Sequence, residues 1–320
     1  MSRYGAISRV MPELAPGAKL FLVSDSDDTT VGPLNLGAEF PVDKDGVVRV
    51  YTTIQAAINA CASNRGDVVL ALPGYNQTIT GDSWNVAGVT VLGMGRGTMR
   101  PTLTYAVATA TVDVGASNVR ISGMRFLAAA DSIARAVDAD TAFVGLQFDN
   151  NIFDFDTLTN DFRVMLRLGQ RRSVIENNRF LAQDTAGSGS GIRLKGGDAS
   201  YATIRNNFFY GQFDTVGDTS DGGAAIAIDT ADTADTNLSG FLIQNNVIVS
   251  TDTAVGAAIR LLGGGYKVRG ILDGNKIGSY DCAGADSTIF SAGGAATTAN
   301  RLYRFDTVEK LMNDSGVLGA

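Results

Sequence analysis

The chain has 320 residues, of which 45% are hydrophobic and 18% are charged, and its formal net charge is −7. This apolar content can bury a core, which excludes a disordered protein, and 38 glycines are typical of a β-rich fold with tight turns. The negative charge argues against a nucleic-acid surface. The absence of histidine excludes Ser-His or Cys-His nucleophile pairs and most zinc sites.

The first 50 residues lie outside any repeat. Short strands are expected at 19–23 and 47–51, and four of the six prolines of the chain fall in this part, which is typical of an irregular segment. We expect residues 1–50 to form an extended arm that attaches the protein to a partner. No apolar segment resembles a secretory signal or a membrane span, so we expect Cys61 and Cys282 to be free thiols made in a reducing cytoplasm.

A single amphipathic helix is predicted at 52–65, capped by Thr52 or Thr53. Its apolar face is spaced at helical intervals and comprises Ile54, Ala57, Ile58 and Cys61. A buried strand is expected to follow at 66–74. Because a solenoid must cover its open end with an atypical element, this helix is expected to cap the fold.

One short frame recurs along the body of the chain: an apolar residue, any residue, Asn or Gly, Asn, any residue, and an apolar residue. Five copies have their first Asn or Gly at Asn150, Asn177, Asn206, Asn245 and Gly274, and two looser copies upstream have Gly93 and Gly123 at this position. Subtracting these numbers gives steps of 27 to 39 residues, a period typical of solenoids and other arrays. A second series of short alternating segments, from 111–115 to 288–293, keeps step with the first.

Two series of strands in step predict two stacked sheets, and we expect an all-β fold, a right-handed parallel β-helix over residues 51–298. A β-sandwich with hairpin turns at each Asn-Asn pair would not hold one frame over so many units. The first column of the frame is expected to form a structural corner ladder, because Asn and Gly tolerate the left-handed backbone and stacked amides bond to one another. Its members are Asn150, Asn177, Asn206, Asn245 and Gly274.

The segment TIQAAINAC, followed by GDVVLALPGYNQTI, resembles the start of the β-helix in the pectate-lyase-like superfamily. The resemblance covers roughly residues 50–295 and implies the fold. The superfamily includes lyases, hydrolases, esterases, tailspikes and virion proteins without enzymatic activity. An N-terminal arm before a short stack of coils is similar to bacteriophage virion proteins with a β-helical body.

Two long inserts, 211–223 and 229–240, are rich in Asp, Thr and Gly and are expected to protrude as loops. Residues 299–320 leave the repeat and are expected to form a helix that closes the C-terminal end or joins a neighbouring subunit. Its apolar face would comprise Leu302, Phe305, Val308, Leu311 and Met312.

If the protein is an enzyme, Asp149 and Glu176 are the candidate catalytic pair. Each precedes the corner Asn of its coil, so both are expected to point outward on adjacent coils, about 5 Å apart as in a retaining glycosidase. The alternative is a solvated ladder of mixed charges, with Glu176 also beside Arg205. Only one tryptophan, Trp84, is present, although saccharide-binding faces usually expose aromatic side chains.

The second series of strands has its own outward column, expected to run Asp113, Asp138, Arg167, Arg193, Ala227, Arg260 and Phe290. Asp138 and Arg167 form a natural cross-strand pair. Arg167, Arg193 and Arg260 could bind an anionic partner. Too few carboxylates gather here for calcium, and the Asp-rich loop 214–235 is expected to stay solvated, so neither a metal nor a cofactor is expected.

These features predict a structural virion protein, a homotrimeric capsid decoration subunit attached through its N-terminal region to the major capsid protein or another virion protein. It would be made in the host cytoplasm and function in the virion, with neither nucleic acid nor membrane as partner. The alternative is a tailspike-type polysaccharide depolymerase, either a glycoside hydrolase or a lyase, that uses Asp149 and Glu176.

Overall fold

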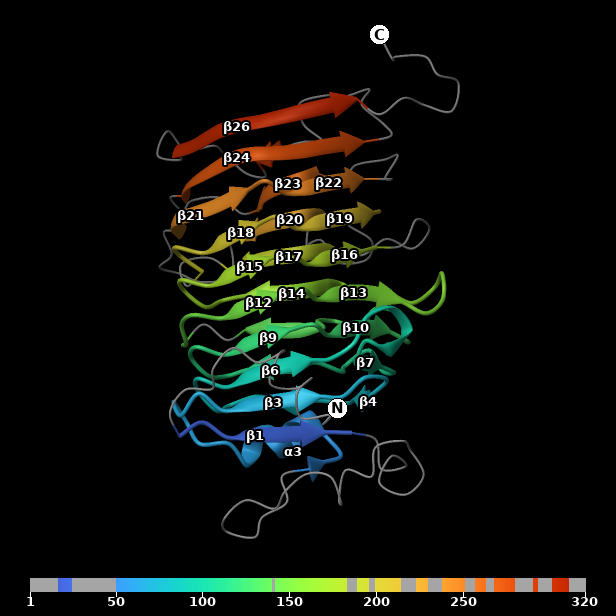
Figure 1. The fold of residues 1–320 in the computed structure, drawn as a ribbon. Coiled ribbons are helices and arrows are strands. Elements are labelled where there is room, and N and C mark those ends of the chain that lie inside the picture. The colour runs from blue at the N-terminus through green and yellow to red at the C-terminus, as the bar shows by residue number, and fades with distance from the viewer. Residues whose placement is uncertain are drawn as a thin grey trace, which may run out of the picture.

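Parallel strands lie one above another along the molecule, with α3 at the N-terminal end and β26 at the opposite end (Figure 1). The computed structural model describes residues 17–24, 50–139, 142–182, 189–195, 199–213, 223–229, 238–250, 257–262, 268–279, 290–292 and 301–310. All named strand pairs among them are parallel, from β1 with β3 to β24 with β26. The predicted parallel β-helix is therefore the observed architecture.

Each complete coil contributes three strands to three stacks. The first stack holds β1 (Leu20–Val23), β3 (Val68–Ala71), β6 (Thr90–Gly93), β9 (Arg120–Ser122), β12 (Gln147–Asp149), β15 (Val174–Glu176), β18 (Thr203–Arg205), β21 (Leu238–Gln244) and the first parts of β24 (Val268–Ser279) and β26 (Arg301–Lys310). The second stack holds β4 (Asn76–Ile79), β7 (Thr102–Tyr105), β10 (Arg125–Ala128), β13 (Ile152–Phe155), β16 (Arg179–Leu181), β19 (Phe208–Gly211), β22 (Val247–Ser250) and the second parts of β24 and β26. The third stack holds β5 (Asp82–Ser83), β8 (Val112–Val114), β11 (Val137–Ala139), β14 (Val164–Leu168), β17 (Ser190–Lys195), β20 (Ala224–Asp229), β23 (Ala257–Leu262) and β25 (Phe290–Ala292).

Two sheets were predicted, and the described strands form two: the first and second stacks belong to one sheet, and the third stack is the other. The sequence did not show that the larger sheet bends at each corner, because the Asn-Asn frame itself spans two strands. In one coil, β12 ends at Asp149 and β13 begins at Ile152, with the corner between them. A left-handed residue at that corner turns the chain sharply, so the strands on either side belong to different faces of the solenoid.

The backbone at this corner is left-handed. The value of φ is 57° at Asn150, 58° at Asn177, 56° at Asn206, 53° at Asn245 and 63° at Gly274. Glu176 pairs with Arg205 across β15 and β18, which places Asn177 and Asn206 at equivalent corners of successive coils. The first Asn of each pair thus supplies the bend.

The amide ladder expected at the first Asn is instead formed by the second, and that part of the prediction was wrong. The residues involved are Asn151, Asn178, Asn207, Asn246 and Asn275, all at most 1% exposed. At each step, the Oδ1 atom accepts a hydrogen bond from the backbone N–H of the preceding coil's Asn, over 2.9–3.0 Å. Each Nδ2 group donates to a main-chain carbonyl of the preceding coil, as Asn207 does to Ile175. The ladder therefore satisfies corner groups that would otherwise be buried without partners.

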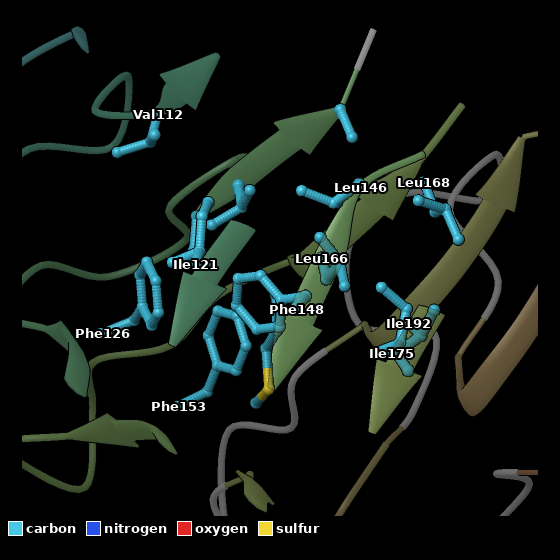
Figure 2. Close-up of a cluster of buried hydrophobic side chains, with 14 of the residues drawn as sticks. Val112, Ile121, Phe126, Leu146, Phe148, Phe153, Leu166, Leu168, Ile175 and Ile192 are labelled. Carbon is cyan, nitrogen blue, oxygen red and sulfur yellow. The ribbon is translucent and has the colours of Figure 1, made fainter. Parts of the chain in front are cut away.

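The core fills the space between the three stacks, as the inward-pointing side chains of Figure 2 show. Four phenylalanines of the second stack lie above one another, with centroid separations of 4.8 Å, 5.0 Å and 4.7 Å along the series Phe126, Phe153, Phe180 and Phe209. All four are fully buried. Because each coil places its aromatic ring at the same offset from the corner, the repeat produces a continuous aromatic stack.

The predicted helix is present but short, spanning α3 (Ile54–Asn59). Thr53 caps it by accepting a hydrogen bond from the Ala56 N–H, and Ile54 and Ile58 are buried. Beyond its end, the Ala62 N–H donates to the Asp67 carboxylate at 2.8 Å. A short 3₁₀ turn, η2 (Gly97–Met99), follows later in the chain.

The N-terminal 50 residues were expected to stay outside the coils. Part of this segment, β1, instead adds a strand to the N-terminal end of the first stack. It pairs in parallel with β3 and also with β2 (Val50–Tyr51). Phe21 and Val23 are buried in the core, and the Lys19 N–H donates to Asp67 at 2.8 Å. The remaining parts of the expected arm, 1–16 and 25–49, lie outside the described residues.

The predicted C-terminal helix is wrong over residues 301–310, which form β26 and pair in parallel with β24. If the stack ended at β24, the backbone N–H and C=O groups along its outer edge would have no partners. β26 pairs with that edge and satisfies them. Residues 311–320 lie outside the described residues, as do Cys282 and most of the two predicted Asp-rich loops. Cys61 is a half-buried free thiol whose pKa burial raises to about 12.

Candidate functional site

The outer face of the first stack carries the predicted carboxylate pair. Asp149 on β12 pairs in register with Ser122 on β9 and with Glu176 on β15, and Glu176 pairs with Arg205 on β18. Asp149, Glu176 and Arg205 contribute to the lining of a pocket of about 240 Å³. The complete lining is Arg120, Gln147, Asp149, Val174, Glu176 and Arg205.

Asp149 was expected to be exposed, but it is only 6% exposed and fully engaged in hydrogen bonds. It accepts from Arg120 Nε at 2.8 Å and Nη2 at 3.0 Å, from Ser122 Oγ at 2.7 Å and from Asn150 Nδ2 at 2.8 Å. Burial alone would raise the pKa of the Asp149 carboxyl, but these hydrogen bonds and the charge of Arg120 hold it below its ordinary value. Asp149 is therefore ionised at neutral pH.

Glu176 has its own cationic partner. Arg205 Nε donates to Glu176 Oε2 at 2.7 Å, and the Arg205 side chain is 46% exposed. The pocket thus contains two ion pairs, Arg120 with Asp149 and Glu176 with Arg205. The arginine lies on the earlier coil in the first pair and on the later coil in the second. The four charges cancel, and none is left to act on a ligand without breaking a pair.

This arrangement does not suit glycoside hydrolysis. Both retaining and inverting glycosidases need one carboxyl group that carries a proton near neutral pH. This group donates its proton to the glycosidic oxygen of the leaving group. Asp149 cannot supply that proton, because Arg120 and Ser122 favour its ionised form. Its hydrogen bonds also occupy the lone pairs that a nucleophile would use. The geometry favours a structural role for both carboxylates.

Arg120 and Ser122 were missed in the sequence because they lie in the earlier copy around Gly123, whereas the candidate pair came from the copies that begin at Asn150. The frame at 118–126 aligns with that at 146–153 and places Arg120 opposite Gln147. From there, a long side chain reaches the diagonal neighbour Asp149 on the next strand. The register of two repeats therefore places Arg120 near Asp149, but the hydrogen bonds between them are seen only in the structure.

The three arginines of the third stack do not form an open cationic face, contrary to expectation. Arg167 Nη1 donates to Asp138 at 2.9 Å, which confirms the predicted cross-strand pair and neutralises this cation. Arg193 is only 8% exposed, and the fully buried Ala227 stands between it and the half-buried Arg260 in the ladder. An anionic partner would not reach all three side chains.

One member of the expected outward column was misplaced. Phe290 pairs with Ile259, an inward position, whereas Ser291 pairs with Arg260. The sequence pattern was therefore read one residue out of register at this strand. Within the described part of the chain, no group of three or more potential metal-ligating side chains comes together.

A second carboxyl group with a shifted pKa, that of Asp161, lies on the loop between β13 and β14. Asp161 is 7% exposed and accepts a hydrogen bond from the Ser132 N–H at 2.5 Å. Burial, helped by the negative charge of Asp131 and opposed by the Ser132 hydrogen bond, raises the pKa of Asp161 from 3.8 to about 6. The folded protein therefore binds a proton here more tightly than the unfolded chain does.

The sign of this shift predicts a pH dependence of stability. The contribution of Asp161 is fully present below about pH 4 and is lost as pH rises through about 6. Asp161→Asn mimics the protonated form and keeps the oxygen that accepts from Ser132. We expect it to stabilise the protein by about 1–2 kcal/mol at pH 8 and to have little effect at pH 4, as measured by urea unfolding.

Asp156→Asn is the matched control, because Asp156 is exposed on the same loop and its Oδ1 acceptor for Asn160 is kept. It is expected to change the unfolding midpoint little at either pH. A destabilised Asp161→Asn variant at pH 8 would contradict the assignment.

Comparison with family models found no match to this chain, and a search of curated proteins found no similar sequence. The parallel β-helix therefore rests on the strand pairing itself. Neither of the two described helical segments is long and apolar enough to cross a membrane.

Proposed function

We propose that this chain is a structural protein of a virus particle, a β-helical subunit that decorates a bacteriophage capsid as a homotrimer. The observation that carries the proposal is the state of the candidate catalytic pair. Asp149 is held ionised by Arg120 and Ser122, and Glu176 is paired with Arg205. Charges arranged in this way brace adjacent coils rather than perform acid–base chemistry.

The resemblance of residues 50–295 to pectate-lyase-like β-helices supports the finer part of the proposal. In that superfamily, a short stack of coils behind an N-terminal segment is typical of phage virion proteins. A rod of this kind needs an attachment point, and α3 marks one end of it (Figure 1). We assign attachment to the N-terminal region at that end, with the major capsid protein or another virion protein as partner.

Deletion of residues 1–16 tests the attachment. A larger deletion of residues 1–45 would also remove β1, whose Phe21 and Val23 are part of the core, so the shorter deletion is the cleaner one. Particles assembled without this chain are mixed with the purified protein and sedimented. The full chain is expected to sediment with the particles, and the truncated chain to bind at least ~10-fold more weakly.

The truncated chain should keep the circular dichroism spectrum of the full protein, because every described strand remains. If it binds particles as tightly as the full chain, residues 1–16 are not the anchor. If neither form binds any particle, the virion role itself is wrong.

A tailspike-type depolymerase is the second candidate, favoured only by the 240 Å³ pocket that contains Asp149 and Glu176. The same purified protein decides between the two functions. Incubation with bacterial surface polysaccharides should release no new chain ends. Release that disappears in the Asp149→Asn, Glu176→Gln double variant would favour the enzyme.

A further inference from the structure

Three arginines gather at the corner between the first and second stacks. Arg96 precedes the turn η2 and Arg100 follows it, in the loop that joins β6 to β7. Arg179 is the first residue of β16, three coils further along the second stack. None of the three lines the pocket that contains Asp149. Together they are called the arginine cluster.

The side chain of Arg100 extends along the axis of the solenoid towards Arg179. Its Nη1 group donates to the carbonyl of Asn150, at the corner between β12 and β13. The intervening coil turns at Gly123, which has no side chain to block this reach. Ile152 lies two residues after Asn150 and pairs with Arg179 on the next coil. The hydrogen bond to Asn150 therefore holds the Arg100 guanidinium beside the coil that carries Arg179.

The three cations are close enough to repel one another. Burial lowers the pKa of Arg100 below its ordinary value, and the positive charges of Arg179 and Arg96 lower it further. The Nε–H group of Arg100 is buried and has no hydrogen-bond partner. The guanidinium of Arg179 lies over the Phe208 ring at 5.8 Å, a contact that positions it without neutralising its charge. The cluster thus combines uncompensated positive charge with a donor that lacks an acceptor.

The absence of a counter-charge at the arginine cluster is unusual for this chain, which has 33 acidic and 26 basic residues. Asp149 on β12 and Asp154 on β13 are already paired with Arg120 and Arg125. Other described arginines also pair with carboxylates, namely Arg65, Arg135, Arg167 and Arg205. Among the described residues, no carboxylate forms an ion pair with the arginine cluster. A buried polar group left without a partner is often satisfied by an ion, so the cluster has the properties of an anion site.

We propose that the arginine cluster binds an oxyanion of the phosphate type, either free phosphate or the phosphate group of a larger ligand. A phosphate group carries a charge of about −1.5 to −2 at neutral pH and offers at least three acceptor oxygens, whereas a carboxylate offers one charge and two oxygens. Several guanidinium groups can therefore donate to one phosphate.

The three side chains have different roles in this site. Arg100 is central, because Asn150 holds its Nη1 group and its Nε–H group still needs an acceptor. Arg96 and Arg179 are exposed and supply further N–H groups to the ligand. The site does not depend on the proposed role in a virus particle, and its test is separate from that of particle binding.

The experiment is isothermal titration calorimetry of the full chain with inorganic phosphate at a fixed ionic strength. The wild type is expected to bind with a dissociation constant of about 1 mM or lower. Arg100→Gln and Arg179→Gln each remove one guanidinium and are expected to raise this constant at least ~10-fold. Arg171→Gln is the matched control, because Arg171 is exposed between β14 and β15 and its loss changes the net charge equally. It should leave the constant unchanged.

A second titration, with glucose 6-phosphate, separates the two sources of the phosphate group. Tighter binding of this ester than of the free ion indicates a phosphorylated ligand, and the reverse order indicates free phosphate. Circular dichroism establishes that each variant keeps its strands. Arg179 is exposed, so its variant keeps the test valid if the half-buried Arg100 proves necessary for folding.

Three results would overturn the proposal. The wild type might bind neither compound, in which case the arginine cluster is not a phosphate site. Unchanged binding in folded Arg100→Gln and Arg179→Gln variants would place the phosphate elsewhere. An equal loss in Arg171→Gln would show a general attraction by positive charge rather than a defined site.

Discussion

Replacing Asn207 with glycine is expected to destabilise the protein by about 3–5 kcal/mol, because the change removes one rung of the buried amide ladder. Asn207 Oδ1 accepts from the backbone N–H and the Nδ2 group of Asn178, both at 3.0 Å. Its Nδ2 group donates to the Ile175 carbonyl at 2.9 Å and to Asn246 Oδ1 at 3.0 Å. All these partners are buried, so water cannot replace the lost hydrogen bonds.

The neighbouring position provides the matched control. Asn206 precedes Asn207, is exposed and has a φ of 56°, a conformation that glycine adopts without strain. Asn206→Gly is therefore expected to change the free energy of unfolding by no more than about 1 kcal/mol. Urea unfolding of both variants gives the comparison. Equal losses at the two positions would show that the ladder does not carry the difference.

Replacing Phe180 with alanine is expected to cost about 3–5 kcal/mol, since it opens a cavity in the middle of the aromatic stack. The Phe180 ring lies 5.0 Å from that of Phe153 and 4.7 Å from that of Phe209, with interplanar angles of 12° and 7°. The side chain is fully buried. Both neighbouring coils lose packing, because each repeat of a solenoid is stabilised by contacts with the repeats beside it.

Phe180→Leu separates the loss of volume from the loss of the ring. Leucine fills much of the space, so we expect a loss of about 1–2 kcal/mol, less than half of that in Phe180→Ala. Calorimetry or urea unfolding measures both. A Phe180→Ala variant within about 1 kcal/mol of the wild type would mean that the surrounding coils collapse into the cavity.

The periodic features of the fold could be predicted from the sequence. The repeat of Asn or Gly followed by Asn identified the solenoid, and the tolerance of Asn for the left-handed region identified the corners at Asn150 and Asn177. The capping helix followed from the spacing of Ile54 and Ile58. These features depend on backbone preferences and on residues close together in the chain, which a single sequence displays directly.

The candidate site was predictable only in part. The frame placed Asp149 and Glu176 on adjacent coils, and the register of β12 with β15 agrees. It did not show that Arg120 reaches Asp149, because that contact is diagonal and joins residues 29 apart in the sequence. A carboxylate that looked exposed and available is therefore buried, paired and ionised.

The sequence by itself thus determined the period, the positions of the corners and the inward placement of the phenylalanine three residues after a corner, because each depends on local conformation and on the alternation of side chains along a strand. Only the tertiary structure decided which Asn of each pair forms the ladder, whether residues 301–310 become a helix or β26, and how Asp149 is charged. Those outcomes depend on which groups the neighbouring coil presents at hydrogen-bonding distance. One coil alone does not contain that information, since its polar groups find their partners only when the next coil stacks upon it.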